Sequence, residues 1–368
     1  MKEKITNFEA ISFLLIVTIA GIVLSTNKIL ITGSKSASIL NVIYITILAI
    51  VLVYILCLLS KKFIGQNLLD ISEFLGGRIL KNIVGFIFIC YITFRIATLL
   101  RIISITMQNV YYPMTHIIFI IALFCLTAAI ICNLKSSSLF KTNSFVFIII
   151  FISMLLIFIG NSKNYDINNI YPILGDGIKN TFLTGTLNIF SFCGIVYLFF
   201  LPSKLKNPEK FTKIAIISML LSGIFLVLCT LTTLLLFSDN LNNSDIFPLY
   251  LAVRYIEFGT FFQRLDALFL FLCSIGFISV LCFNTFILTS ILQDITNVSD
   301  DKPLILPCLF TIFDLSLIIK RYPTIEYLEN NLTKIFFLIV AIILPFIILI
   351  FANIKRLFYQ KNILKGAK

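Results

Sequence analysis

Long apolar runs, separated by short polar segments, follow one another along the whole chain. Each run comes close to the ~20 residues that an α-helix needs to cross roughly 30 Å of hydrocarbon. The pattern predicts ten membrane-spanning helices, spans 1 to 10, at about 8–30, 37–59, 83–104, 112–133, 143–160, 182–201, 212–237, 265–292, 303–319 and 333–354. We therefore expect an all-α integral membrane protein with a single membrane domain over residues 1–368.

The connection between spans 2 and 3, residues 60–82, differs from the others. Its apolar side chains recur near helical spacing, and Asp70, Glu73 and Arg78 fall between them. This pattern predicts an amphipathic helix at the cytoplasmic face, lying in the membrane interface or packed under the bundle. The pair Gly76–Gly77 is expected to end or kink it.

Composition and charge narrow the class of protein. The chain is 59% hydrophobic and only 12% charged, which excludes a soluble enzyme, a nucleic-acid-binding module and a disordered tail. The net charge of +12 then indicates cationic cytoplasmic loops. With both termini inside, the inner segments hold 18 Lys and Arg residues and the outer segments hold 9. This bias predicts cytoplasmic N- and C-termini.

Catalytic and metal-binding signatures are missing from the sequence. The nine cysteines lie inside apolar runs without a C-x-x-C, which is typical of small buried side chains rather than disulfides or metal ligands. His116, the single histidine, is expected to be structural. No P-loop, zinc or nucleophile-elbow motif occurs in a plausible context, so we expect no enzyme, no metal and no cofactor.

Ten spans divide evenly into residues 8–160 and 182–354, and an odd number of spans in each half would invert the second copy. Transporters built from inverted repeats break the first helix of each half near the membrane midplane, where the freed backbone binds the ligand. The small-residue stretches Thr18–Ile22 and Ser191–Gly194 are the candidate breaks. Small residues also mark tight helix packing, so both interpretations stay open here.

Two ionisable residues fall deep inside spans, where an unpaired charge is costly. Arg95 lies about 20 Å above the cytoplasmic end of span 3, at 1.5 Å per residue, and Asp314 lies about 17 Å up span 9. We predict that Arg95 and Asp314 form an ion pair. The alternative is two separate residues facing water or loop carbonyls.

A second group of charges lies near the outer surface. Arg101 and Asp266 are at similar depth, with Glu257 and Arg264 close in sequence. They could form a cluster above a pocket, or their side chains could extend to the lipid headgroups. The core shows no second carboxylate, so proton- or sodium-driven transport is not indicated by charge, although carbonyl sites for sodium stay open.

Four stretches in order carry a family resemblance. They are Phe247–Ile256 with Phe261–Phe269, Tyr171–Lys179 leading into Ser191-Phe192-x-Gly194 and Leu201-Pro202, Lys4–Asn7, and Asp70–Gly76. The first contains a Pro, an Arg-Tyr-Ile and an Arg-Leu-Asp-Ala that opens span 8. Across nearly its whole length the chain resembles the B subunit of bacterial spore nutrient-germinant receptors, within the amino acid–polyamine–organocation transporter superfamily.

The resemblance implies a fold, a place and a role. The fold would be ten helices in a five-plus-five inverted repeat of the LeuT type. The protein would lie in the inner membrane of the spore, assemble with the receptor's A and C subunits, and bind no nucleic acid. It would bind a small germinant, expected to be an amino acid, between spans 1, 3, 6 and 8. The alternatives are an amino acid permease and a scaffold whose partner binds the nutrient.

The resemblance also implies pocket residues. They are Ala20, Gly21, Ser191, Cys193 and Gly194 through their backbone and Tyr91 through its side chain. Two positions depart from the family pattern. Ala20-Gly21-Ile22 stands where members often have a G-x-G turn, and Val196 stands where they often have an acidic residue. Whether span 1 unwinds therefore stays open.

Overall fold

The computed structural model describes residues 4–134, 136–175, 177–237, 247–256, 265–298, 300–319 and 322–366. Apart from one isolated bridge, all regular elements in these residues are helical. The α-helices are α1 (Asn7–Gly21), α2 (Asn27–Ser34), α3 (Ser38–Ser60), α4 (Leu68–Val110), α5 (Ile117–Cys132), α6 (Ser136–Gly160), α7 (Ile195–Leu198), α8 (Phe211–Phe237), α9 (Pro248–Arg254), α10 (Leu265–Thr296), α11 (Lys302–Ile318), α12 (Tyr322–Leu328), α13 (Lys334–Phe337) and α14 (Leu344–Gly366).

Short helical turns of other geometry join or extend these helices. The π-helical turns are η1 (Ile22–Thr26), η4 (Lys179–Leu183), η8 (Glu329–Thr333) and η9 (Leu338–Ile343). The 3₁₀ turns are η2 (Lys35–Ala37), η3 (Ile167–Ile170), η5 (Thr184–Phe192), η6 (Pro202–Lys204) and η7 (Pro208–Lys210). Elements α12 to α14 follow one another without a gap, so residues 322–366 form one long helix.

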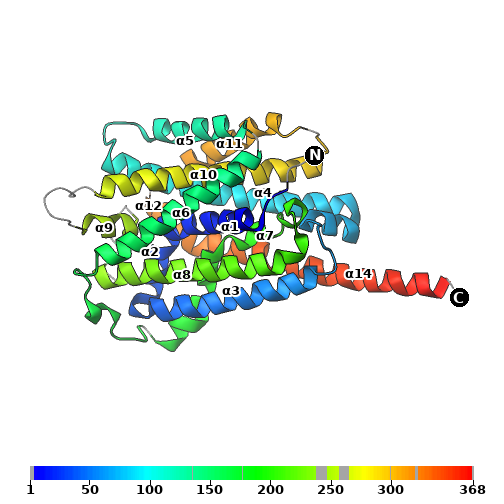
Figure 1. The fold of residues 1–368 in the computed structure, drawn as a ribbon, viewed down its shortest axis with the longest axis horizontal. Coiled ribbons are helices and arrows are strands. Elements are labelled where there is room, and N and C mark those ends of the chain that lie inside the picture. Colours follow the sequence, from blue (N-terminus) through cyan, green and yellow to red (C-terminus); the bar gives the residue numbers. More distant parts are fainter. Residues whose placement is uncertain are drawn as a thin grey trace.

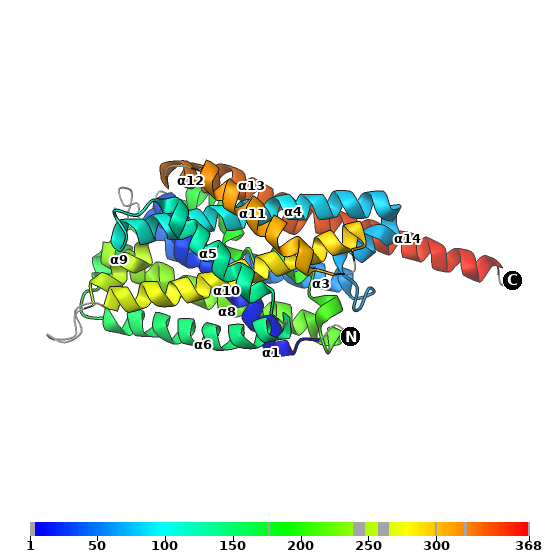
Figure 2. The same ribbon diagram turned by 90° about the horizontal axis from the view of Figure 1, so that it is seen from above.

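The long helices run side by side as an elongated bundle (Figures 1 and 2). Helix α1 packs against α6, α8 and α10, which places it at the centre. Six stretches among the described residues are long and apolar enough to cross a membrane, and Asn7–Ser60 is one of them. At about 1.5 Å per residue its 54 residues exceed a single crossing. The chain reverses at Lys35, whose φ of 48° ends α2.

Residues 68–82 of the segment between spans 2 and 3 form the first turns of α4. Asn67 and Asp70 make a reciprocal capping box at its N-terminus. Gly76 and Gly77 leave helical geometry, and Gly77 has a φ of 69°, which glycine adopts without strain. The kink therefore falls at the Gly-Gly pair that the sequence singled out, and residues 78–110 continue as the membrane helix.

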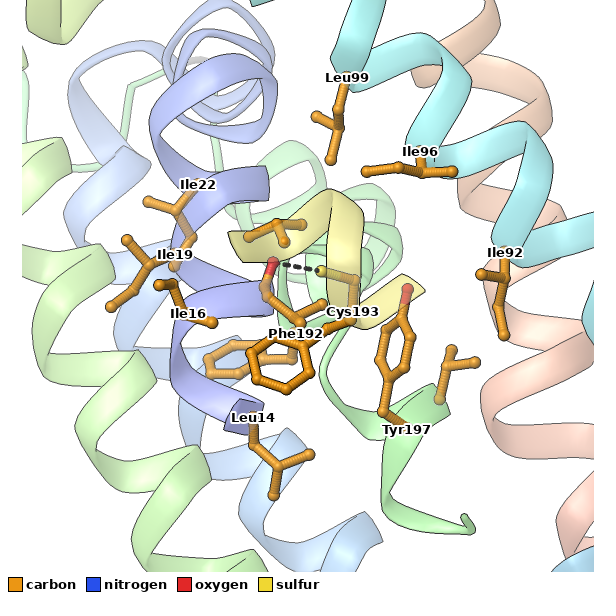
Figure 3. Close-up of a cluster of buried hydrophobic side chains, with 14 of the residues drawn as sticks. Leu14, Ile16, Ile19, Ile22, Ile92, Ile96, Leu99, Phe192, Cys193 and Tyr197 are labelled. Atoms are coloured by element: carbon orange, nitrogen blue, oxygen red, sulfur yellow. Dashed lines mark hydrogen bonds between the residues drawn. The ribbon is translucent and has the colours of Figure 1, made fainter. Parts of the chain in front are cut away.

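Side-chain burial separates an interior from a lipid-facing surface. Spans 1, 3 and 6 pack through buried apolar side chains, shown in Figure 3: Leu14, Ile16, Ile19, Ile22, Ile92, Ile96, Leu99, Phe192, Cys193 and Tyr197. On α5 and α6 large apolar side chains such as Phe119, Leu126, Phe145 and Leu156 are exposed. A soluble protein avoids such continuous apolar faces, whereas hydrocarbon favours them.

The two ends of the chain lie toward the same end of the bundle, and α14 extends beyond it (Figures 1 and 2). Near the N-terminus Thr6 and Glu9 cap α1 reciprocally. Ile5 then bonds to the segment after span 6, since its amide donates to the Lys204 carbonyl at 2.9 Å. The start of span 1 is thereby tied to the end of span 6.

Candidate functional site

Span 1 is helical throughout, and no break occurs in it. Gly21 has helical angles, with φ −61° and ψ −44°, and the chain passes from α1 directly into the π-helical turn η1. The Ser25 hydroxyl donates to the Gly21 carbonyl at 3.3 Å. The stretch Thr18–Ile22 therefore does not unwind. The irregularity of span 1 is the widened π-helical turn η1, which begins at Ile22, the last residue of that stretch.

Span 6 is irregular over most of its length. After the π-helical turn η4 it narrows into the 3₁₀ turn η5, and a tight turn at Cys193–Gly194 leads into the four-residue α7. The amides of Val196 and Tyr197 bond to the carbonyls of Cys193 and Gly194, three residues back, at 3.2 and 3.1 Å. The stretch Ser191–Gly194 thus lies where span 6 changes geometry.

Glycine lets span 6 approach span 1 closely. A Cβ atom on Gly194 would lie 2.3 Å from Thr18 Oγ1 and 3.0 Å from the Leu14 carbonyl oxygen. The neighbouring Cys193 thiol donates to the Val17 carbonyl at 3.6 Å. Gly194 is therefore a contact position between the two spans, in line with the packing role of small residues in membrane helices.

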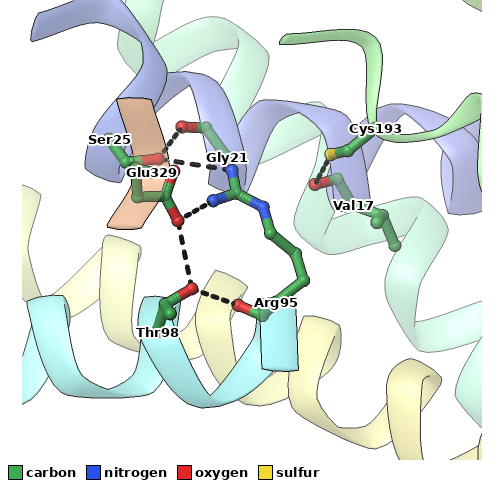
Figure 4. A network of polar contacts seen from close by, with 7 residues as sticks. All are labelled: Val17, Gly21, Ser25, Arg95, Thr98, Cys193 and Glu329. Carbon is green, nitrogen blue, oxygen red and sulfur yellow. Dashed lines mark hydrogen bonds and ion pairs between the residues drawn. The ribbon is translucent and has the colours of Figure 1, made fainter. Parts of the chain in front are cut away.

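A buried ion pair lies beside these contacts (Figure 4). Arg95 Nη1 donates to Glu329 Oε1, and the two side chains are 3% and 1% exposed. Arg95 Nη2 donates to Ser25 Oγ at 3.3 Å. The Thr98 hydroxyl shares its proton between Glu329 Oε1, at 3.1 Å, and the Arg95 carbonyl, at 2.7 Å. Each charge is thus compensated and hydrogen-bonded, as burial requires.

The predicted pairing of Arg95 with Asp314 is wrong. Asp314 is exposed on α11, whereas the partner of Arg95 is Glu329, the first residue of η8. Matching the depths of two residues fixes their level along the bundle, but it leaves open the direction in which each helix turns them. The exposed position of Asp314 corresponds to the alternative interpretation, in which the two residues are separate.

Gly21 makes room for the guanidinium. A Cβ there would lie 2.9 Å from Arg95 Nη2 and 3.4 Å from Cys193 Sγ. The Arg95 side chain therefore lies between span 1 and span 6, and its partner comes from the long helix of span 10. We call Gly21, Ser25, Arg95, Thr98, Cys193 and Glu329 the polar centre.

Several buried polar atoms at or next to the polar centre have no hydrogen-bond partner among the described residues. They are Arg95 Nε, Glu329 Oε2, Tyr91 Oη and Ser191 Oγ. Tyr91 is completely buried, with its ring edge-to-face against Phe336 at 5.3 Å between centroids. Buried polar groups in proteins are normally bonded to protein, water or ligand. The predicted residues Tyr91 and Ser191 thus carry unused hydrogen-bonding capacity.

Ala20 lies on another face of span 1. It lines an apolar cavity of about 40 Å³ together with Ile16, Ile19, Leu24, Phe225 and Phe277. This cavity is separate from the polar centre, so Ala20 and Gly21, adjacent in sequence, face different surroundings.

The outer charges are buried as well. Asp266 accepts a hydrogen bond from Tyr250 Oη at 2.9 Å, and Arg101 is 6% exposed. Tyr250 belongs to α9, outside the long helices; burial raises the pKa of its hydroxyl and the bond to Asp266 raises it further. Glu257 and Arg264 lie outside the described residues. An Arg101–Asp266 cluster stays a prediction.

The sequence pattern alone missed Glu329, Ser25 and Thr98. Span 10 was expected to begin at 333, because Glu326, Glu329, Asn330 and Asn331 lower the local hydropathy. The helix in fact begins at Tyr322. One signal was present: Glu326 and Glu329 are three residues apart, a helical spacing that places both on one face of an extended span 10.

Solved transporter structures share this fold at low sequence identity. A substrate-bound, outward-open Na⁺-coupled sialic acid symporter matches with a TM-score of 0.64 and 12% identity, over 92% of this chain and 79% of its own. Inward-facing Mhp1 matches with a TM-score of 0.60 and 11% identity, over 92% of this chain and 74% of its own. A manganese transporter of Eremococcus coleocola matches with a TM-score of 0.56 and 14% identity, over 92% of this chain and 77% of its own. The protein is thus an all-helical membrane protein of the LeuT fold.

Sequence comparison identifies the family. No curated protein sequence matches the chain. The sequence profile of the spore germination protein family, Spore_permease, matches residues 4–325 of the 368. That match includes every residue of the polar centre except Glu329. It is a family of permease-like membrane proteins and not of enzymes. The chain therefore belongs to the spore germination protein family.

Proposed function

We propose that this protein is the B subunit of a spore nutrient-germinant receptor. The family match over residues 4–325 supports a role in germination. The observation that carries a ligand-binding role is the polar centre, where a buried ion pair and unpartnered polar atoms meet at the irregular turns of spans 1 and 6. A structural bundle gains nothing from such a costly centre, whereas a binding site does.

The proposed site lies between spans 1, 3 and 6, with span 8 on the neighbouring side and span 10 added by Glu329. Gly21, Cys193 and Gly194 line it through backbone and close packing, and Tyr91 and Ser191 offer unbonded hydroxyls. Ala20 lines the adjoining apolar cavity. The ligand is a small germinant, and an amino acid is the leading candidate.

The proposed architecture is ten crossings in two inverted halves, residues 8–160 and 182–354, in the inner membrane of the spore. Both termini would be cytoplasmic, which agrees with the excess of inner Lys and Arg and with chain ends at one end of the bundle. The protein would act with A and C subunits. Ligand binding triggers germination only by favouring one conformation of that complex over another.

Germination assays test this proposal directly. Spores lacking the gene are exposed to a panel of amino acids and sugars, and the release of dipicolinic acid is followed. We expect the response to one nutrient to be lost while growing cells take up amino acids normally. Unchanged germination on every nutrient would contradict the receptor role.

The second candidate function is an amino acid permease, and the fold shared with solved transporters favours it. This function predicts ligand uptake by growing cells or by liposomes that contain the purified protein. Normal germination of the deletion spores combined with lost uptake would support the permease and overturn the receptor proposal.

A further inference from the structure

The polar centre is neutral as a whole, yet it is incompletely bonded. Arg95 and Glu329 are buried and cancel each other's charge. Each keeps an atom without a partner among the described residues, Nε on Arg95 and Oε2 on Glu329. Tyr91 lies one helical turn before Arg95 on α4 and has an unpartnered hydroxyl too. The centre therefore offers donors and acceptors beyond those that the ion pair uses.

We propose that Arg95 and Glu329 form a two-point receptor for a zwitterion. The carboxylate of the ligand binds the Arg95 guanidinium, its ammonium group binds the Glu329 carboxylate, and the direct ion pair opens to admit it. Glu329 thus acts in the empty protein as a tethered substitute for the carboxylate of the ligand. This inference rests on the proposed function and names the ligand class of that site, an α-amino acid.

Charge balance selects that class. Opening a buried ion pair leaves two desolvated charges, which is costly unless both find new partners. A neutral sugar compensates neither charge. A simple carboxylate satisfies Arg95 but leaves Glu329 unpaired, and a simple amine does the reverse. A ligand with both charges satisfies both groups and keeps the net charge of the centre at zero.

The local backbone allows such an opening. Glu329 begins the π-helical turn η8, and Ser25, which accepts from Arg95 Nη2, lies in the π-helical turn η1. Single π-helical turns occur often at functional sites. Gly21 leaves room for the guanidinium, because a Cβ there would lie 2.9 Å from Arg95 Nη2. Glu329 is therefore carried by a turn that departs from regular α-helix, and Arg95, which lies on the regular part of α4, contacts a second such turn through Ser25.

A matched set of small probes tests the proposal on the full-length protein in lipid nanodiscs. The set contains glycine, L-alanine and L-valine, the counterparts of each without the amino group or without the carboxylate, and glucose. Calorimetry or ligand-dependent thermal stabilisation gives each Kd. We expect at least one of the amino acids to bind about 30-fold or more tightly than its singly charged counterparts and than glucose.

Two variants change the ligand class in opposite directions. Glu329→Gln leaves Arg95 as the unpaired charge, so the preference should shift to the carboxylate without an amino group, such as propionate. Arg95→Gln leaves Glu329, so the preference should shift to the amine, such as ethylamine. Each variant should lose about 30-fold or more in amino acid affinity. A misfolded protein cannot gain a new ligand, so these gains separate recognition from instability.

Glu326→Gln is the matched control. It removes a carboxylate one turn earlier in the same helix, where Glu326 meets Lys28 at 3.5 Å. This variant should keep the amino acid preference of the wild type. Equal binding of glucose and amino acids, absence of amino acid binding, or variants that keep the wild-type preference would each overturn the zwitterion receptor. The receptor role itself fails by a different result, namely normal germination of spores that lack the gene.

Discussion

Two sides of span 1 differ in packing and polarity although they belong to one helix. One side carries Thr18, Gly21 and Ser25 and meets the polar centre. The contacts there are so close that a Cβ atom added to Gly21 would overlap the Arg95 guanidinium. The other side carries Ile16, Ile19 and Ala20 and borders an apolar cavity of about 40 Å³. We call these the polar side and the apolar side.

The difference shows where this protein can tolerate change. In a membrane, helices gain little from the hydrophobic effect against one another, and they associate through close packing and polar contacts. The polar side concentrates both, since it holds the glycine contacts and the buried charges. The apolar side retains spare volume. Substitutions on the polar side should therefore have the largest effects.

Removing one charge from the polar side should have the largest effect on stability. Glu329→Ala leaves the Arg95 guanidinium buried without a counter-charge, which typically costs about 3–5 kcal/mol. The measurement is the free energy of unfolding in mixed micelles. The double variant Arg95→Met, Glu329→Leu should recover most of that loss, because apolar replacement of a whole buried pair is often neutral. A loss below about 1 kcal/mol for the single variant would contradict a buried ion pair between Arg95 and Glu329.

Adding one methyl group at the contact of spans 1 and 6 should have the next largest effect. In Gly194→Ala the new Cβ meets Thr18 Oγ1 at 2.3 Å, so we expect a loss of about 1–3 kcal/mol in unfolding free energy and a weakened nutrient response in spores. Gly33→Ala is the control, since nothing lies within 4 Å of its Cβ. Equal effects of the two substitutions would show that tight packing is not the cause.

Removing the acidic half of the Lys28–Glu326 ion pair should cost less. In the pair Lys28–Glu326 the Glu326 side chain is 27% exposed but the Lys28 side chain is only 3% exposed, so solvent screens the pair from one side. In Glu326→Gln the new amide oxygen can still accept from the buried Lys28 ammonium, so we expect a loss of about 1–2 kcal/mol, with a decrease at high salt. The free energy of unfolding in mixed micelles, determined at low and at high salt, measures this loss. A loss as large as that of Glu329→Ala would mean that burial does not separate the two pairs.

Filling the apolar side should have the smallest effect. Ala20→Val places two carbon atoms toward the cavity, and each new contact gains only about 0.1–0.2 kcal/mol of dispersion energy. We expect a change within about 0.5 kcal/mol of the wild-type unfolding free energy and an unchanged nutrient response. A strongly altered nutrient response would indicate that the ligand binds in this cavity and not at the polar centre.

The sequence located part of the candidate site and missed its acidic half. Arg95, Gly21, Cys193 and Gly194 could be singled out, because a charge or a small residue inside an apolar run stands out locally. Glu329 could not, because its polar neighbours moved the expected start of span 10 to residue 333. Depth then suggested Asp314, which the structure leaves exposed on α11.

The sequence by itself determined the class of this protein, the places of its long helices, the Gly76–Gly77 kink and the family. These follow from hydropathy, glycine geometry and local motifs, all of which are properties of neighbouring residues. Only the tertiary structure decided that Glu329 pairs with Arg95, that span 6 changes from π-helical to 3₁₀ to α-helical geometry while span 1 keeps its helical path, and that Ala20 and Gly21 face different surroundings. Those outcomes depend on how each helix is rotated about its axis and on how closely glycines let two helices approach, and no local pattern records either.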